Sequence, residues 1–189
     1  MEKHWWRLIA GGLMILVGII LLLVQLGMIT LEGPLWGSVV LLAGASVFLA
    51  LWLGNRAEWW PLIPGSIMGG WGVALLLESL GLADWVVTLV GFGATVLPFL
   101  YVFLKLGSSE AWWALIPAGV IGAWGLGTVL GQAGLHDAVV TFVGFVGSAV
   151  PFLIIFAMHR QKNWWALIPG GVMVLMGVVT TLGELVGEE

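Results

Sequence analysis

The chain has 189 residues, of which 61% are hydrophobic and only 8% are charged, and its formal net charge is −4. A soluble domain carries about 25% charged residues, so this composition excludes a soluble fold with a polar surface. The absence of cysteine excludes disulfides and thiolate chemistry, and the few scattered basic residues give no sign of nucleic-acid binding.

Seven stretches of the sequence lack Asp, Glu, Lys and Arg and are long enough to cross a bilayer. A hydrocarbon core of about 30 Å requires roughly 20 apolar residues as a helix, which satisfies its own backbone groups in lipid. Because the first stretch aligns with later ones, we interpret it as a retained helix and not as a signal peptide. The stretches are Leu8–Leu31, Gly33–Asn55, Trp59–Leu77, Trp85–Leu104, Ala111–His136, Ala138–His159 and Asn163–Gly183.

One motif recurs along the chain at a spacing of 52 to 54 residues, which is typical of a repeat protein. Its copies are Trp5–Gly18, Trp59–Gly72, Trp112–Gly125 and Trp164–Gly177. A second motif, Asp84–Leu100, recurs as Asp137–Leu153. The sequence therefore predicts an all-α membrane protein with one transmembrane domain, residues 1–189, and seven helices. We expect three and a half tandem two-helix repeats, at 5–58, 59–111, 112–163 and 164–189.

The basic residues predict the orientation of the chain, because Lys and Arg are retained on the cytoplasmic side. With seven spans, all of them fall on one side: Lys3, Arg7, Arg56, Lys105, Arg160 and Lys162. The other side carries Glu32, Glu78, Asp84, Asp137, Glu184, Glu188 and Glu189. The sequence thus predicts a cytoplasmic N-terminus and a C-terminus outside.

Tryptophan pairs mark the start of each odd-numbered span, where the indole ring and its N–H favour the headgroup level. These predicted interface anchors are Trp5, Trp6, Trp59, Trp60, Trp112, Trp113, Trp164 and Trp165. A role in stacking a ligand or pigment is the alternative. Trp71 and Trp124 lie deeper, and we expect them either to be buried in packing or to face lipid, with each indole N–H bonded to the other tryptophan or to a backbone carbonyl.

Proline and glycine mark expected bends and helix contacts. Pro98 and Pro151 lie deep in their spans and predict kinks, either structural or as a functional break. Pro64, Pro117 and Pro169 fall near the first turn of theirs, where a proline forfeits little hydrogen bonding. Small residues allow close approach of helices in lipid. The predicted packing glycines are Gly18, Gly65, Gly69, Gly72, Gly122, Gly125 and Gly177.

Few residues of the sequence have side chains that could act in catalysis or bind a metal or cofactor. The histidines, His4, His136 and His159, lack the spacing of a metal or haem site, so we expect no catalytic, metal or cofactor-binding residues. Thr88 and Thr141 are expected to bond to their own helices or to cap them. Four polar residues near the ends of odd-numbered spans are candidates for a shallow outer polar site or for simple interfacial solvation. They are Glu78, Gln25, Gln132 and Glu184.

The two-helix unit W-x-L-I-P-G-G, followed by glycines, L-G-L and a short basic turn, resembles the LiaI–LiaF-like transmembrane region. The resemblance is clearest over Trp5–Leu53 and Trp164–Gly183. It implies a small multi-pass protein of the bacterial cytoplasmic (inner) membrane, and a role in sensing envelope stress. It implies no catalytic residues.

Three functions remain open from the sequence. The first is a non-catalytic accessory or scaffold subunit that packs laterally, among membrane lipids, against other membrane proteins or against copies of itself. The second is a small transporter, channel, or lipid- or pigment-binding protein with a cavity at the two deep prolines. The third is the envelope-stress sensor that the resemblance implies.

Overall fold

The computed structural model describes residues 33–187 without a gap, together with residues 11–12, 15, 18–19, 22–23 and 25–27. Within this part of the chain, six helices are long and apolar enough to cross a membrane, and no strand occurs. The prediction of an all-helical fold with helices long and apolar enough to span a membrane is thus confirmed for the described residues. Most of the first predicted span, with His4, Trp5 and Trp6, lies outside the described residues.

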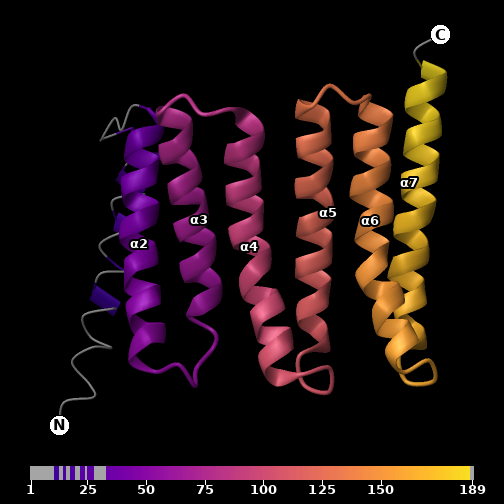
Figure 1. Ribbon diagram of the computed structural model, residues 1–189, viewed down its shortest axis with the longest axis horizontal. Helices are drawn as coiled ribbons and strands as arrows, with labels where there is room; N and C mark the ends of the chain where they lie inside the picture. The colour runs from indigo at the N-terminus through magenta and orange to yellow at the C-terminus, as the bar shows by residue number, and fades with distance from the viewer. Residues whose placement is uncertain are drawn as a thin grey trace. The chain divides into compact units, whose positions relative to one another are not determined.

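The chain divides into two compact units, Met1–Ala83 and Asp84–Glu189, which we call unit 1 and unit 2. Unit 1 contains α2 (Pro34–Gly54) and α3 (Leu62–Ser79), which pack against each other as an antiparallel hairpin (Figure 1). The boundary between the units falls inside the predicted repeat 59–111. The prediction of a single domain stays a prediction.

Unit 2 is a series of consecutive antiparallel helices in which α4 packs on α5, α5 on α6, and α6 on α7 (Figure 1). Short connections force this arrangement, because they leave successive helices as neighbours. The helices are α4 (Asp84–Leu106), α5 (Leu115–Gln132), α6 (Asp137–Met158) and α7 (Leu167–Gly187).

Each described tryptophan pair directly precedes an α-helix. Trp112–Ala114 and Trp164–Ala166 form short 3₁₀ turns, η1 and η2, which lead into α5 and α7. The proline of the motif is then the third residue of its α-helix, at Pro117 in α5 and at Pro169 in α7. A proline in the first turn costs little, since that N–H has no partner within the helix.

Glycine ends two of these helices in the same way. Gly81 and Gly134 have φ of +77° and +86°, a left-handed conformation that glycine adopts without strain. The next residue then bonds back into the helix, with Leu82 N donating to Leu77 O and Leu135 N to Leu130 O. This is the glycine-terminated helix end that reverses the chain sharply.

One glycine contact recurs in each described hairpin of the motif. A Cβ built at Gly72 would lie 2.9 Å from Leu42 Cγ, and one at Gly125 would lie 2.7 Å from Phe92 Cβ. At Gly177 it would lie 2.8 Å from Val146 Cγ2. In all three cases the even-numbered helix occupies the space that a side chain would need. The predicted packing role of these glycines therefore has a direct geometric basis.

The other predicted packing glycines differ in how closely the neighbouring helix approaches them. A Cβ at Gly65 would meet Leu49 and Phe48 at 3.1 Å, whereas Gly69 and Gly122 leave ordinary contact distances of 3.5 and 3.7 Å. Gly18 has no atom within 4 Å of a built Cβ among the residues that the structure describes. Its packing role stays a prediction.

The interface between α5 and α6 also depends on small residues, but they come from both helices. Gly144 lies against the Trp124 ring, and Gly119 lies against the Pro151 ring, where a Cβ would be 2.6 Å from Pro151 Cγ. Trp124 also meets the Phe145 ring edge-on, with centroids 5.3 Å apart. Trp124 thus packs on α6 with one side while 38% of its surface stays exposed, so it combines the two positions that the sequence left open.

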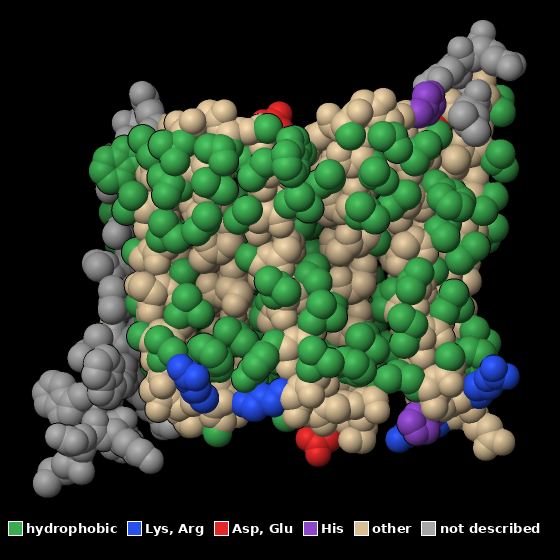
Figure 2. Space-filling model, viewed as in Figure 1, with side chains coloured by type: hydrophobic (Ala, Val, Ile, Leu, Met, Phe, Trp, Pro, Cys, Tyr) green, Lys and Arg blue, Asp and Glu red, His purple; other side chains and the backbone are tan. Residues whose placement is uncertain are grey.

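The surface between the helix ends is largely apolar. On the face shown in Figure 2, hydrophobic side chains cover the middle of the helices, and charged side chains lie near their ends. Buried side chains are mainly small, and Ile155 and Val102 are the largest aliphatic ones that are fully buried among the described residues. A chain with so little interior and so much exposed apolar surface matches a lipid environment and not water.

Replacing Gly125 by leucine should destabilise unit 2 by about 1–3 kcal/mol, because the new side chain must displace Phe92. Gly93 of α4 provides the matched control, since no atom lies within 4 Å of its built Cβ. Thermal unfolding of the purified chain in detergent, followed by tryptophan fluorescence, measures the difference. Equal unfolding midpoints for Gly125→Leu and Gly93→Leu would contradict the proposed close contact.

Candidate functional site

Two polar side-chain pairs connect neighbouring helices within unit 2. Gln132, the last residue of α5, donates from Nε2 to Oγ1 of Thr88 in α4 over 2.9 Å. Thr141 of α6 donates from Oγ1 to Oε1 of Glu184 in α7, also over 2.9 Å. The two pairs occupy matching positions, since Thr88 and Thr141 each lie four residues after the aspartate that begins their helix. The same geometry therefore occurs once with an amide and once with a carboxylate.

A further hydrogen bond lies beside the carboxylate pair. Thr181 of α7, one turn before Glu184, donates from Oγ1 to the carbonyl oxygen of Ala138 over 3.4 Å. Thr181 was not singled out from the sequence, and Thr141 was expected to bond within its own helix. That expectation is wrong, because the Thr141 hydroxyl donates across to α7. The signal that could have identified both threonines is their position, one helical turn from a polar residue of the repeat.

The four polar residues of the predicted outer site have different environments. Gln132 and Glu184 are partly buried and pair with threonines, as described above. Glu78 is exposed near the end of α3, and Gln25 is exposed as well. The structure thus gives two of these residues defined partners on a neighbouring helix.

Aromatic contacts organise the opposite end of the helices. Trp60 meets Phe48 of α2 edge-on with centroids 6.4 Å apart, and Trp113 meets Phe99 of α4 at 6.5 Å. Trp112 meets Trp165 at 5.6 Å. Each of these tryptophans therefore packs on a neighbouring aromatic ring.

Some of these indole rings are also partly exposed at the surface. Trp60 and Trp164 are 50% and 62% exposed, and Trp60 Nε1 donates to Glu58 Oε2 over 3.3 Å. A half-exposed ring with a polar partner fits the amphipathic position that an interface anchor requires.

The basic side chains lie at the same end as the tryptophan pairs within each unit. In unit 1, Arg56 lies in the link between α2 and α3, and its guanidinium is 5.2 Å from the centroid of the Trp52 ring. In unit 2, Lys105 lies at the end of α4, and Arg160 and Lys162 lie between α6 and α7. The acidic residues Asp84 and Asp137 begin their helices at the other end of unit 2. There the helix dipole stabilises their negative charge.

The two deep prolines lie inside α4 and α6, as predicted, and both are buried. A hydroxyl three residues earlier donates to its own helix, from Thr95 to Gly91 O over 2.8 Å and from Ser148 to Gly144 O over 2.5 Å. Such bonds add to the bending that proline causes. Both helices bend along their length in Figure 1.

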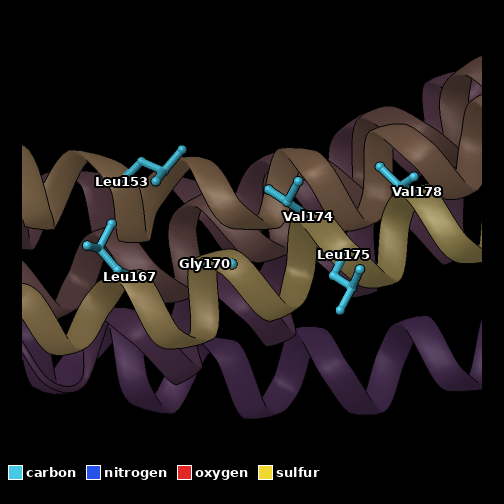
Figure 3. Close-up of a pocket in the computed structure, with 7 residues that line it drawn as sticks. Leu153, Leu167, Gly170, Val174, Leu175 and Val178 are labelled. Atoms are coloured by element: carbon cyan, nitrogen blue, oxygen red, sulfur yellow. The ribbon is translucent and has the colours of Figure 1, made fainter.

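An open apolar pocket of about 420 Å³ lies over α5 between α4 and α6. Its floor is made by small residues of α5, including Gly119 and Ala123, and its walls include Leu100 and Pro151. A second open apolar pocket, of about 400 Å³, lies between α6 and α7 and is shown in Figure 3. Neither pocket has the convergent polar groups that orient a polar substrate.

The histidines that the structure describes have local roles. His136 precedes α6 and accepts a bond from Ala138 N at its Nδ1 over 3.1 Å, which caps the helix, and His159 follows the end of α6. Within the described residues, no group of three or more His, Cys, Asp or Glu is placed to hold a metal ion.

Two polar contacts, one buried and one partly buried, could not be expected from the repeat. Ser38 of α2 donates to Gly72 O over 2.7 Å, at the glycine that packs against Leu42 of α2. Asn163 donates from Nδ2 to Ile155 O over 2.8 Å and so fixes the link between α6 and α7.

Comparison of this chain with protein-family models, curated proteins and solved structures finds no match.

The Thr88–Gln132 bond should contribute to the stability of unit 2. A double-mutant cycle with Thr88→Val and Gln132→Leu is expected to give a coupling energy of about 0.5–2 kcal/mol, the range for hydrogen bonds between membrane helices. Thr180 serves as the control, because its hydroxyl bonds within α7 to Met176 O. A cycle of Thr180→Val with Gln132→Leu should be additive. Equal coupling in the two cycles would show that the bond has no specific effect.

Proposed function

We propose that this chain is a non-catalytic accessory or scaffold subunit that packs laterally against another integral membrane protein. We place it in the cytoplasmic membrane of a bacterium, with seven spans in tandem two-helix repeats, a cytoplasmic N-terminus and a C-terminus outside. The recurring sequence motifs support the repeats. The described basic residues, Arg56 in unit 1 and Lys105, Arg160 and Lys162 in unit 2, lie at the tryptophan end of their units and support the orientation.

The observation that carries the proposed function is an uncovered face on α7. By the repeat spacing, Gly171 and Gly183 of α7 match Gly119 and Gly131 of α5. In α5 these two glycines pack against α6. A Cβ at Gly119 would lie 2.6 Å from Pro151, and one at Gly131 would lie 3.1 Å from Val140. No described atom lies within 4 Å of a Cβ at Gly171 or Gly183.

The residues between these glycines are exposed as well. Leu175 and Val179 are 63% and 57% exposed, although they match Ala123 and Gly127, which pack on α6. Figure 3 shows the side chains of Leu175 and Val174 pointing in different directions from α7, although both border the pocket drawn there. The α7 face, defined as Gly171, Leu175, Val179 and Gly183, therefore has the position of a helix-binding surface, and no described helix of unit 2 covers it.

The expected occupant is an apolar transmembrane helix of a different protein, antiparallel to α7, with a bulky apolar side chain over Gly171. Small residues drive helix association in lipid by permitting close van der Waals contact. A second copy of this chain is a weaker fit, because α6, which covers the matching α5 face, is already packed between α5 and α7.

A photo-crosslinking side chain placed at position 171 should react with one stoichiometric membrane partner, and the same group at position 174 should not. Val174 provides the matched control, because the residue of α5 that it matches, Gly122, lies against Val96 of α4 and not against α6. Both Val174 and Gly171 line the pocket between α6 and α7, so the two positions have similar access to small molecules. The measurement is native gel separation after mild-detergent extraction, with mass spectrometry of the crosslinked band. In addition, Gly171→Trp should release the partner, whereas Val174→Trp should retain it.

A crosslink only between copies of this chain would replace the accessory subunit with a homo-oligomer. A product that is equal at both positions, or a partner that survives Gly171→Trp, would contradict the role of the α7 face.

A second candidate, the binding of a lipid chain or similar apolar ligand, is favoured by the pocket over α5. Its floor of glycine and alanine leaves a groove beside the bent part of α6, at Pro151. An apolar groove without charged walls suits an acyl chain and not an ion.

Filling this groove should reduce lipid retention. Leu126, which lines it and is 53% exposed, can be replaced by tryptophan. Native mass spectrometry of the purified chain should then show fewer bound lipids than in the wild type. Leu182→Trp, at a similarly exposed leucine of α7 (55%), is the control and should leave retention unchanged. Unchanged retention in Leu126→Trp would contradict specific binding in the groove.

A further inference from the structure

Oxygen atoms from α6 and α7 converge where α6 begins and α7 ends. The two hydrogen bonds there cross, since Thr141 reaches Glu184 while Thr181 reaches back to Ala138. This oxygen cluster therefore contains a carboxylate, two hydroxyls and one backbone carbonyl, contributed by two helices within unit 2. It is separate from the α7 face and from both pockets.

The carboxylate of this cluster is incompletely satisfied. Oε1 of Glu184 accepts from Thr141, but Oε2 is buried and has no hydrogen-bond partner. The sequences of α5, α6 and α7 contain no lysine or arginine that could neutralise it. A buried, unpaired carboxylate oxygen in a membrane-spanning helix is costly and is a functional candidate for that reason.

The chemistry of the surrounding groups indicates what would neutralise it. Both threonine hydroxyls donate their hydrogens in the observed bonds, so their lone pairs remain available as ligands. Carboxylate, hydroxyl and carbonyl oxygens are the ligands that hard metal cations prefer. One carboxylate balances a single positive charge. We propose that the oxygen cluster binds a small monovalent metal cation such as Na⁺.

The matching position in the preceding repeat supports this assignment. There Gln132 replaces Glu184, and Val129 replaces Thr181, so the charge and the second hydroxyl are both absent. The polar contact between helices is nevertheless kept, from Gln132 to Thr88. An uncharged amide at this position is therefore sufficient to connect the two helices. The repeat that has a carboxylate instead, Glu184, also has an additional oxygen ligand, Thr181. A proton would need only one carboxylate oxygen and gives no reason for Thr181.

The test is the thermal unfolding of the full chain in uncharged detergent, at fixed pH and constant ionic strength. NaCl is exchanged for N-methylglucamine chloride, whose cation is too large to enter the cluster. Wild type should unfold at a midpoint roughly 3–6 °C higher when Na⁺ is present at about ten times its Kd. Glu184→Gln, which makes this position resemble Gln132, should abolish the shift.

Glu78→Gln is the matched control. Glu78 is likewise a carboxylate near the end of a transmembrane helix, but it is exposed. This variant should keep the full response to sodium. Thr181→Val introduces the residue that the preceding repeat has at this position, Val129, so the variant should fold. It should weaken the apparent sodium affinity several-fold. This variant tests the proposal if Glu184→Gln cannot be purified.

The proposal is overturned if wild type shows no difference between the two salts, or if Glu184→Gln or Thr181→Val responds to sodium as wild type does. It is also overturned if the midpoint depends on Glu184 through pH alone and not through sodium, since the cluster would then bind only a proton. None of these outcomes depends on whether the α7 face binds a partner.

Discussion

Close contact between a glycine of one helix and a side chain of the preceding helix is the constraint on which this structure depends. Lipid provides no hydrophobic force between helices, so packing must come from van der Waals contact. At Gly72, Gly125 and Gly177 the neighbouring helix comes so near that no Cβ would fit without displacement. The position of each odd-numbered helix follows from that approach, and the tryptophan pair at its start then meets the aromatic rings of its neighbours.

Polar contacts are placed around this apolar packing and differ between repeats. Near one end of the helices, the Thr88–Gln132 and Thr141–Glu184 pairs connect neighbouring helices with similar geometry. Replacing the amide by a carboxylate changes little in shape but leaves a buried oxygen without a partner. A repeat can thus keep its fold while one copy acquires different chemistry, because the packing glycines and the polar pair are separate features.

The same separation applies to the exposed surface of α7. Its face matches the one that α5 uses to hold α6, yet the residues between its two glycines are larger, with Leu175 and Val179 in place of Ala123 and Gly127. The spacing of the glycines is kept while the surface between them changes. A helix that covers this face would therefore have to fit a different contour from that of α6.

The amino-acid sequence is sufficient to predict the class of fold and the place of the helices from α2 to α7, because both depend on local properties of the chain. Apolar stretches of about 20 residues without charge must be helices in lipid. The helices observed from α2 to α7 fall within or close to the predicted stretches, and the prolines lie where the motif places them. The first span, Leu8–Leu31, stays a prediction, since most of it lies outside the described residues.

The pairing of the polar groups could not be predicted from the sequence, because it depends on the rotation and height of one packed helix against the next. The sequence indicated Gln132 and Glu184 as polar residues near helix ends, but it assigned Thr141 to its own helix and gave Thr181 no role. A rotation of a helix by one residue would point these side chains elsewhere while leaving the hydrophobic pattern unchanged. Glycine contacts such as that of Gly177 with Val146 fix this rotation, and they can be measured only once the helices are packed.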